Sequence, residues 1–225
     1  MLDNGDSSLI ISPKGKSILI DGGEDDQNVL LPYLLARKVR RLDYIIISHF
    51  DSDHIGGLFT VMENLNVNRI VISKQKESCE NYEVFKEIIK KRKIKVLVVD
   101  IGDKLQIEKN LYLDILWPDN SKQINENVLN NNSIVCKLNY NNFSCIFTGD
   151  IEEIAEKQIV KYYKKNLKVL DSTILKVAHH GSNTSSTEDF LIKINPKIAL
   201  IGVGKNNKFG HPNEEVIRRL KDIRD

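Results

Sequence analysis

Residues 48–57, Ser-His-Phe-Asp-Ser-Asp-His-Ile-Gly-Gly, concentrate side chains that can bind a metal ion. Two imidazoles and two carboxylates fall within six residues, at His49, Asp51, Asp53 and His54. Carboxylates packed this closely repel one another, and a divalent cation reverses that penalty. The spacing therefore predicts a metal site, and a metal site predicts Lewis-acid chemistry such as hydrolysis.

The remaining histidines are also placed unevenly. The chain has five in all, and His179 and His180 are adjacent in Val-Ala-His-His-Gly-Ser, directly after the apolar run 174–178. His211 stands in Phe-Gly-His-Pro, beyond the apolar run 198–203. We expect all five to lie in loops at the ends of strands, where α/β proteins tend to place their sites. A lone histidine is more often a surface or core residue, and that alternative stays open for His211.

The elements that would carry these side chains can be read from apolar patterning and turn residues. A buried strand at 43–48 leads into the first cluster, and a helix is predicted at 57–65. Hairpins are predicted at 8–11 with 17–20 and at 133–140 with 143–148, the second ending at Thr148-Gly149-Asp150. Further strands are expected at 69–73, 94–99, 111–116, 173–177 and 197–203, helices at 28–39, 82–92, 151–163, 187–194 and 213–223, and a long loop at 119–132. Hairpins followed by strand–helix alternation, twice over, predict two sheets with helices outside.

Length and composition describe an ordinary globular protein. At 225 residues, a single domain over residues 1–225 is the natural expectation. No apolar run approaches the ~20 residues that cross a bilayer, and no export signal opens the chain. A complete chain would therefore be cytoplasmic, whereas a fragment of a channel protein could face the cell exterior. Cys79, Cys136 and Cys145 lack metal-site spacing and are expected to be reduced thiols.

The net charge of +2 provides no global attraction for polyanions. Residues 86–95 are locally basic, with six lysines and arginines against Glu87. These side chains could contact a phosphate backbone, but the favoured interpretation is a solvated helix face.

Four motifs, taken together, resemble the metallo-β-lactamase superfamily, and within it the metallohydrolase domain of the ComEC family of competence DNA-uptake channels. The motifs are the cluster 49–54, Thr148-Gly149-Asp150, the His-His-Gly-Ser segment at 179–182, and Gly210-His211-Pro212 before the last helix. Four details favour the ComEC branch, namely Asp51 at the second cluster position, Asn131-Asn132-Ser133 before the Thr-Gly-Asp hairpin, and the His-His-Gly-Ser and Gly-His-Pro motifs themselves. The opening Asn4-Gly5-Asp6-Ser7 is shorter than the corresponding family stretch.

The resemblance implies an α/β (α+β) fold, a four-layer αββα sandwich, with a centre of two divalent metal ions. His49 and Asp51 would hold one ion, Asp53, His54 and His179 the other, and Asp150 would bridge them. Whether His179 or His180 is the ligand is left open. Because the set is rich in oxygen ligands, Mn²⁺ competes with Zn²⁺.

The resemblance also implies catalytic and binding roles. Two metals would activate a water and clamp a phosphate, with Asp53 essential, His180 as general acid and His211 as second choice. Phosphate oxygens could be bound by Asn131, Asn132, Ser133 and Ser182, although each has an ordinary turn or capping explanation. Asp6 and Asp21 could orient the ligand imidazoles.

The function expected from this resemblance is a metal-dependent phosphodiesterase, a nuclease acting on DNA, with nucleic acid or another phosphodiester as substrate. The alternative is a hydrolase of a small ester, lactone or phosphocholine-type substrate. A non-catalytic binding module is disfavoured, because it would have no need of so many carboxylates and imidazoles.

Overall fold

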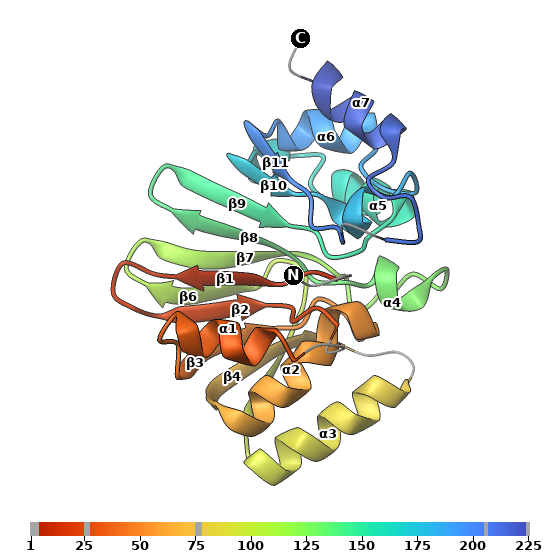
Figure 1. Cartoon of the computed structure of the whole chain (residues 1–225). Helices are drawn as coiled ribbons and strands as arrows, with labels where there is room; N and C mark the ends of the chain where they lie inside the picture. The colour runs from red at the N-terminus through yellow and green to blue at the C-terminus, as the bar shows by residue number, and fades with distance from the viewer. Residues whose placement is uncertain (1–4, 25–27, 75–77, 205–206, 224–225) are drawn as a thin grey trace. The chain divides into compact units, whose positions relative to one another are not determined.

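The computed structural model describes residues 5–24, 28–74, 78–204 and 207–223 (Figure 1). Contacts divide the chain into two compact units. The N-terminal unit comprises residues 1–99 with 203–207, and the C-terminal unit comprises residues 100–202 with 208–225. Each unit has its own sheet and its own apolar core. The single domain expected over residues 1–225 stays a prediction.

The sheet of the N-terminal unit has the strand order β1-β2-β3-β4-β5. Its strands are β1 (Ser8–Ile11), β2 (Ser17–Ile20), β3 (Arg41–Ile46), β4 (Asn66–Ser73) and β5 (Lys95–Val99). Only β1 is antiparallel to its neighbour, while β2 to β5 run parallel. Because parallel strands end at the same edge, the residues after β2 and β3 meet there.

Three helices accompany this sheet, namely α1 (Leu30–Ala36), α2 (Ser52–Asn64) and α3 (Glu80–Arg92). Their apolar faces enter one core, in which Leu34, Leu58 and Phe85 pack with Ile45 and Ile70 of the strands. A core shared by helices and sheet holds the segments that follow β2 and β3 in fixed positions.

The sheet of the C-terminal unit has the order β11-β10-β9-β8-β7-β6. Its strands are β6 (Lys104–Glu108), β7 (Leu111–Trp117), β8 (Val135–Tyr140), β9 (Phe143–Phe147), β10 (Ile174–Lys176) and β11 (Ile198–Leu200). The helices are α4 (Val128–Asn131), α5 (Glu153–Tyr162), α6 (Glu188–Ile194) and α7 (Glu214–Asp222), with 3₁₀ turns η1 (Leu167–Val169) and η2 (Ala178–Gly181). Strands β9 to β11 are parallel, so Asp150 after β9 and the histidines after β10 share an edge.

Both predicted hairpins are confirmed, and most other elements lie within a few residues of their expected bounds. Three differences matter. Helix α2 begins at Ser52 rather than at residue 57, β6 was missed, and α4 lies inside the expected loop 119–132. The prediction that every histidine lies in a loop is wrong for His54, which is in the first turn of α2. The backbone N–H groups of His54 and Ile55 donate to Asp51 O at 3.0 Å, so Asp51 is the N-cap residue.

A buried carboxylate ties α5 to the loop that follows the histidine pair. Glu156 is fully buried and accepts hydrogen bonds from the backbone N–H groups of Ser186 and Thr187, at 2.5 and 2.9 Å, and from Thr187 Oγ1 at 2.7 Å. Burial raises the pKa of Glu156 to about 7, although these donors oppose the shift.

The raised pKa predicts a pH-dependent stability. Because the folded state holds the Glu156 proton more tightly than the unfolded chain, the resulting stabilisation is complete below about pH 4.5 and is lost as the pH rises toward 7. Between those values the free energy of unfolding should fall by roughly 2–3 kcal/mol more in the natural chain than in Glu156→Gln. Urea unfolding of both proteins in EDTA, from pH 4.5 to 7.5, measures this difference. If the free energy of unfolding changed with pH in the same way in both proteins, the prediction would be refuted.

Candidate metal centre

In the N-terminal unit, a glycine turn packs directly against the first turns of α2. Gly22 N donates to His54 O at 2.6 Å, and Gly57 N donates to Gly23 O at 2.9 Å. A Cβ atom on Gly57 would lie 2.4 Å from Gly22 O, and a Cβ on Gly22 would lie 2.6 Å from Leu58 Cγ. Only glycine permits this approach, which places the preceding residue, Asp21, against His54.

Asp21 is the buried carboxylate that orders this cluster. Its Oδ1 accepts from Ser48 N at 2.7 Å, and its Oδ2 accepts from Ser48 Oγ at 2.7 Å and lies 3.0 Å from His54 Nδ1. Ser48 Oγ also lies 3.0 Å from His49 Nδ1. Asp21 thus holds His54 directly and His49 through Ser48, the arrangement by which outer residues orient metal-binding imidazoles. The expectation that Asp21 orients the imidazoles agrees with these contacts.

The two imidazoles fit a metal site. Their ring centroids are 4.2 Å apart, and Asp21 and Ser48 engage the Nδ1 atoms, leaving the Nε2 atoms for metal binding. His49 Nε2 is buried with no hydrogen-bond partner among the described residues, and it lies 3.5 Å from Asp51 Oδ2. His54 Nε2 lies 4.0 Å from Asp53 Oδ2. A buried imidazole nitrogen without a hydrogen bond is costly, and coordination of a cation removes that cost.

Asp6 joins the same cluster. Its N–H donates to Asp53 O at 3.1 Å, and its carbonyl accepts from Gly23 N at 2.9 Å. A carboxylate oxygen of the buried Asp6 and a ring nitrogen of His54 lie within 4.8 Å of each other. Asp6 is therefore a candidate ligand rather than only an orienting residue. The sequence signal for it was the short Gly-Asp-Ser opening motif.

In the C-terminal unit, the Thr-Gly-Asp turn after β9 is joined to the histidine turn after β10. His179 N donates to Gly149 O at 3.1 Å. The carboxylate of the buried Asp150 places Oδ2 at 3.6 Å from His180 Nε2 and 3.9 Å from His179 Nε2. Both histidines have a left-handed backbone, with φ of 49° and 54°. Such backbone strain in non-glycine residues is typical of functional sites.

The two histidines differ in their surroundings. His180 Nδ1 lies 2.9 Å from the carbonyl oxygen of Gly202, so Nδ1 carries the proton and Nε2 presents its lone pair toward Asp150. His179 has 23% of its side chain exposed, and its Nδ1 lies 3.8 Å from Glu152 Oε1. His180 thus has the fixed tautomer typical of a ligand, while His179 is more exposed and lies near the carboxylates of Asp150 and Glu152.

His211 is the third histidine of this unit. Its ring centroid lies 6.0 Å from that of His179, and Phe209 stacks on it at 5.9 Å. Burial and the neighbouring His179 and His180 hold the pKa of His211 below its ordinary value, although Asp150 opposes them. A neutral ring is therefore favoured at pH 7.

The four residues predicted to bind phosphate make hydrogen bonds within the protein. Asn131 Oδ1 accepts from Glu152 N at 3.0 Å, and its Nδ2 donates to Glu152 Oε2 at 3.1 Å. Asn132 closes the loop around Ile124 through both its amide atoms, at 2.9 Å each. Ser133 Oγ accepts from Asp150 N at 3.4 Å, and Ser182 Oγ lies 3.0 Å from Thr184 Oγ1. These contacts agree with the turn and capping alternative.

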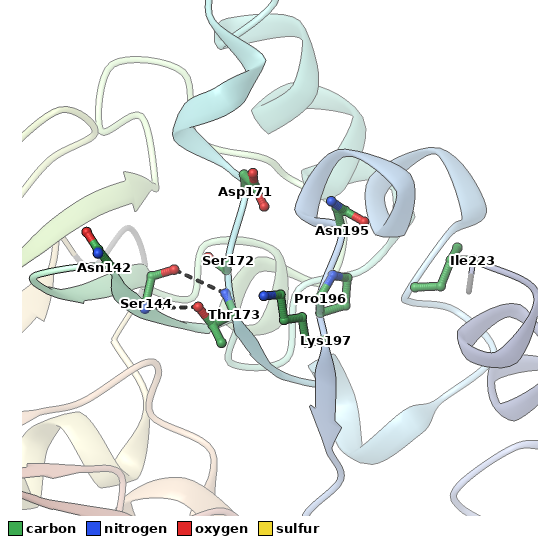
Figure 2. A pocket seen from close by; sticks show the side chains of 9 residues that line it. All are labelled: Asn142, Ser144, Asp171, Ser172, Thr173, Asn195, Pro196, Lys197 and Ile223. Carbon is green, nitrogen blue, oxygen red and sulfur yellow. Dashed lines mark hydrogen bonds between the residues drawn. The ribbon is translucent and has the colours of Figure 1, made fainter. Parts of the chain in front are cut away.

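Figure 2 shows the residues that line a hollow of about 680 Å³ in the C-terminal unit, and no motif residue is among them. It is lined by Ser144, Thr173 and Lys197, at the starts of β9, β10 and β11, and two hydrogen bonds of 3.1 and 3.3 Å link Ser144 to Thr173. Because these strands are parallel, Asp150 and the histidine pair lie at the opposite edge. The hollow is therefore separate from the candidate metal centre.

Comparison with known proteins defines the class. A family model for the Metallo-beta-lactamase superfamily matches residues 2–205. The chain belongs to this superfamily, whose fold has two mixed sheets flanked by helices, and the predicted fold class is confirmed. The fold implies divalent metal ions, and the donor set described above fits them.

Relatives place the chain within the superfamily. It is 34% identical over 195 residues to ComE operon protein 3 of Bacillus subtilis (strain 168), covering 87% of this chain and 24% of the relative. It is 31% identical over 216 residues to Competence protein ComA of Neisseria gonorrhoeae, covering 95% and 28%. The chain therefore spans about a quarter of these relatives, and its resemblance to the ComEC family is confirmed.

A solved structure with the same fold is the metallo-beta-lactamase fold protein YhfI from Bacillus subtilis, with a TM-score of 0.56. The two are 14% identical, and the match covers 98% of this chain and 86% of YhfI. At that identity the likeness concerns the fold alone. Within the part of the chain that the structure describes, no helix is both long and apolar enough to cross a bilayer.

Proposed function

We propose that this metallo-β-lactamase-fold hydrolase is a phosphodiesterase that cleaves DNA. The observation that carries the proposal is the pair of oriented ligand groups, the Asp21-supported His49 and His54 and the Asp150–His180 pair. The choice of DNA is supported by the competence proteins among the relatives.

The chain is proposed to bind two divalent ions, Mn²⁺ or Zn²⁺. The proposed ligands are Asp6, His49, Asp51, Asp53 and His54 in the N-terminal unit and Asp150 and His180 in the C-terminal unit. When bound, the two ions would supply an activated water and neutralise charge on the phosphodiester. Within the N-terminal unit, Asp21 would keep the His54 proton on Nδ1. Asp51 and Asp53 supply the hard oxygen ligands that suit Mn²⁺.

His179 and His180 exchange the roles suggested by the resemblance. The hydrogen bond to the Gly202 carbonyl places the His180 proton on Nδ1, which leaves Nε2 to bind a metal. His179 is more exposed, so its ring can reach the leaving oxygen of a bound substrate and donate a proton to it. The alternative, with His179 as ligand and His180 as acid, is distinguished by metal binding, because only the ligand's alanine variant should lose an ion.

The direct test is hydrolysis by metal-loaded protein. Chain stripped with EDTA and reloaded with Mn²⁺ or Zn²⁺ should cleave linear single- or double-stranded DNA. The rival function, hydrolysis of a small ester, lactone or phosphocholine compound, is supported by the near-neutral net charge of +2. Intact DNA together with rapid hydrolysis of one of those small substrates would decide for the rival.

Asp21→Asn should weaken metal binding without unfolding the chain. Asparagine tolerates the left-handed backbone at position 21, where φ is 57°. Its amide N–H₂ would face the Nδ1 proton of His54, which favours the tautomer with the proton on Nε2, the metal-binding atom. We expect metal affinity to fall about 10–100-fold, measured by titration calorimetry.

Asp43→Asn provides the matched control for this prediction. Asp43 is also a buried carboxylate, at the other end of β3, paired with Lys16 and Arg41. Its replacement should lower stability and leave metal affinity unchanged. Equal metal affinities for Asp21→Asn and the natural chain would show that Asp21 does not tune the site.

A further inference from the structure

A dense group of cations lies at the edge of the N-terminal sheet where β2 and β3 begin. Residues 14–17 of the β1–β2 turn and 37–43 of the α1–β3 loop contain six cationic side chains and one carboxylate, whereas the whole chain has a net charge of only +2. We call this group the cationic hollow. Arg37, Lys38, Arg40, Arg41 and Asp43 line it, and Lys14 and Lys16 lie on either side of Gly15, which also lines it.

The two segments are held together by the carboxylate. Asp43 Oδ1 lies 2.9 Å from Lys16 Nζ and 3.3 Å from Arg41 Nη2, while its Oδ2 accepts from Ser17 N at 3.1 Å. Burial opposes ionisation, but the hydrogen bonds from Lys16 and Ser17 hold the pKa of Asp43 below its ordinary value. Beside this pair lies an open hollow of about 380 Å³, lined in part by Arg37, Lys38, Arg40 and Arg41.

Asp43 thus forms ion pairs with Lys16 and Arg41, which leaves four of the six cationic side chains. Lys14, Arg37, Lys38 and Arg40 are exposed, and none has an ion pair with any residue in the described ranges. The Arg37 guanidinium lies over the Tyr33 ring, 5.3 Å from its centroid, which holds it at the rim. Like charges gathered without counterions create a local positive potential that attracts polyanions.

A purely structural explanation covers only part of this group. Cations near a helix C-terminus interact favourably with the helix dipole, which accounts for Arg37 and Lys38 at the end of α1 but not for Lys14 or Arg40. Moreover, Lys38 has a left-handed φ of 62°. The N–H of Lys38 donates to Leu35 O, and the N–H of Val39 donates to Leu34 O, each at 2.9 Å. These two bonds form a Schellman motif, and the residue that corresponds to Lys38 in this motif is usually glycine. Lysine thus occupies a position at which the backbone favours glycine, as Lys93 does at the end of α3.

The other basic segment, residues 86–95, is partly paired, while Lys90, Arg92, Lys93 and Lys95 form no ion pair with any residue that the structure describes. On α3, Lys86 pairs with Glu83 at 2.8 Å, and Lys91 pairs with Glu63 at 3.6 Å. These contacts agree with the solvated helix face favoured for residues 86–95. This segment therefore provides a comparison of similar charge.

We propose that the cationic hollow binds the phosphate backbone of a nucleic-acid strand, as a contact separate from the ligand cluster. The choice of nucleic acid over another polyanion rests on the proposed function. Asp43 and His49 are six residues apart along β3 and its extension, roughly 20 Å at 3.3 Å per residue. That distance corresponds to about six nucleotide steps of 3.4 Å, so one strand can reach both places.

The test measures binding separately from cleavage. Fluorescence anisotropy in EDTA compares a 20-nucleotide strand bound to the natural chain, to Lys38→Gly, and to the triple variant Lys14→Gln, Lys38→Gly, Arg40→Gln. We expect affinity to fall several-fold for Lys38→Gly and at least 30-fold for the triple variant. For the triple variant, the slope of log affinity against log salt concentration should also be shallower by about 2–3. Because glycine suits the backbone at position 38, Lys38→Gly should fold at least as stably as the natural chain.

The control is a second triple variant, Lys90→Gln, Lys93→Gln, Lys95→Gln, which removes three positive charges from residues 86–95. Equal losses in both triple variants would overturn the proposal, because charge alone would then explain binding. Tighter binding of the natural chain to phosphatidylglycerol vesicles than to DNA would also overturn it in favour of a lipid surface. If binding depends on the hollow but metal-loaded protein leaves DNA intact, the binding inference stands and the proposed nuclease function fails.

Discussion

Replacing Asp53 by alanine should lower metal-dependent DNA hydrolysis by about 10³-fold or more, a loss typical of essential active-site groups. Asp53 lies in the first turn of α2, with its Oδ2 4.0 Å from His54 Nε2, and its carbonyl accepts from Asp6 N. Loss of the carboxylate would remove one of the hard oxygen ligands proposed for the metal ions. The measurement is the initial rate of cleavage at saturating Mn²⁺.

The matched control for that variant is Asp189→Ala. Asp189 is a surface carboxylate of α6 that lies 3.6 Å from Lys193, and its loss should leave the rate unchanged. If Asp53→Ala keeps more than about a tenth of the rate while binding metal normally, Asp53 is neither ligand nor catalytic residue.

Gly57→Ala should destabilise the chain by about 2–3 kcal/mol, although alanine is favoured over glycine in a helix by about 1 kcal/mol. The new Cβ would lie 2.4 Å from Gly22 O and 3.3 Å from Leu30 Cδ2, so the glycine turn or α2 must move. Either movement separates Asp21 from His54, and metal affinity should fall together with stability. Urea unfolding and metal titration measure the two effects.

Gly15→Ala tests whether crowding is the cause. No atom lies within 4 Å of a Cβ at position 15, and only the positive φ of 79° opposes alanine. That variant should lose about 1 kcal/mol or less and keep its metal affinity. If Gly57→Ala were as stable as the natural chain, the close approach of α2 to the glycine turn would not position the ligands.

The elements predicted best are those whose signal is local. The hairpin of β1 and β2 was predicted to the residue, because apolar strands flank an obvious Pro-Lys-Gly turn. Helix α2 was predicted to begin five residues too late, since its N-cap, Asp51, was interpreted only as a metal ligand. Strand β6 was missed because Lys104–Glu108 has no continuous apolar run and pairs only with β7.

The candidate site was also predicted well only where its signal is local in the sequence. The spacing of residues 49–54 predicted a ligand cluster, and the structure brings His49, Asp51, Asp53 and His54 together within the N-terminal unit. The roles of His179 and His180 could not be separated in sequence, because they depend on Gly202 and Glu152, residues distant along the chain. Asn131 holding Glu152, and Glu156 holding the loop after His180, are likewise contacts between distant residues.

Native mass spectrometry of the chain with bound Mn²⁺ is the most direct measurement of the proposed centre. We expect two ions per natural chain and fewer than two in each of His54→Ala and His180→Ala, since each variant lacks one of the proposed ligands. A natural chain that holds fewer than two ions at saturation, or a His180→Ala variant that keeps both, would contradict the proposed ligand set.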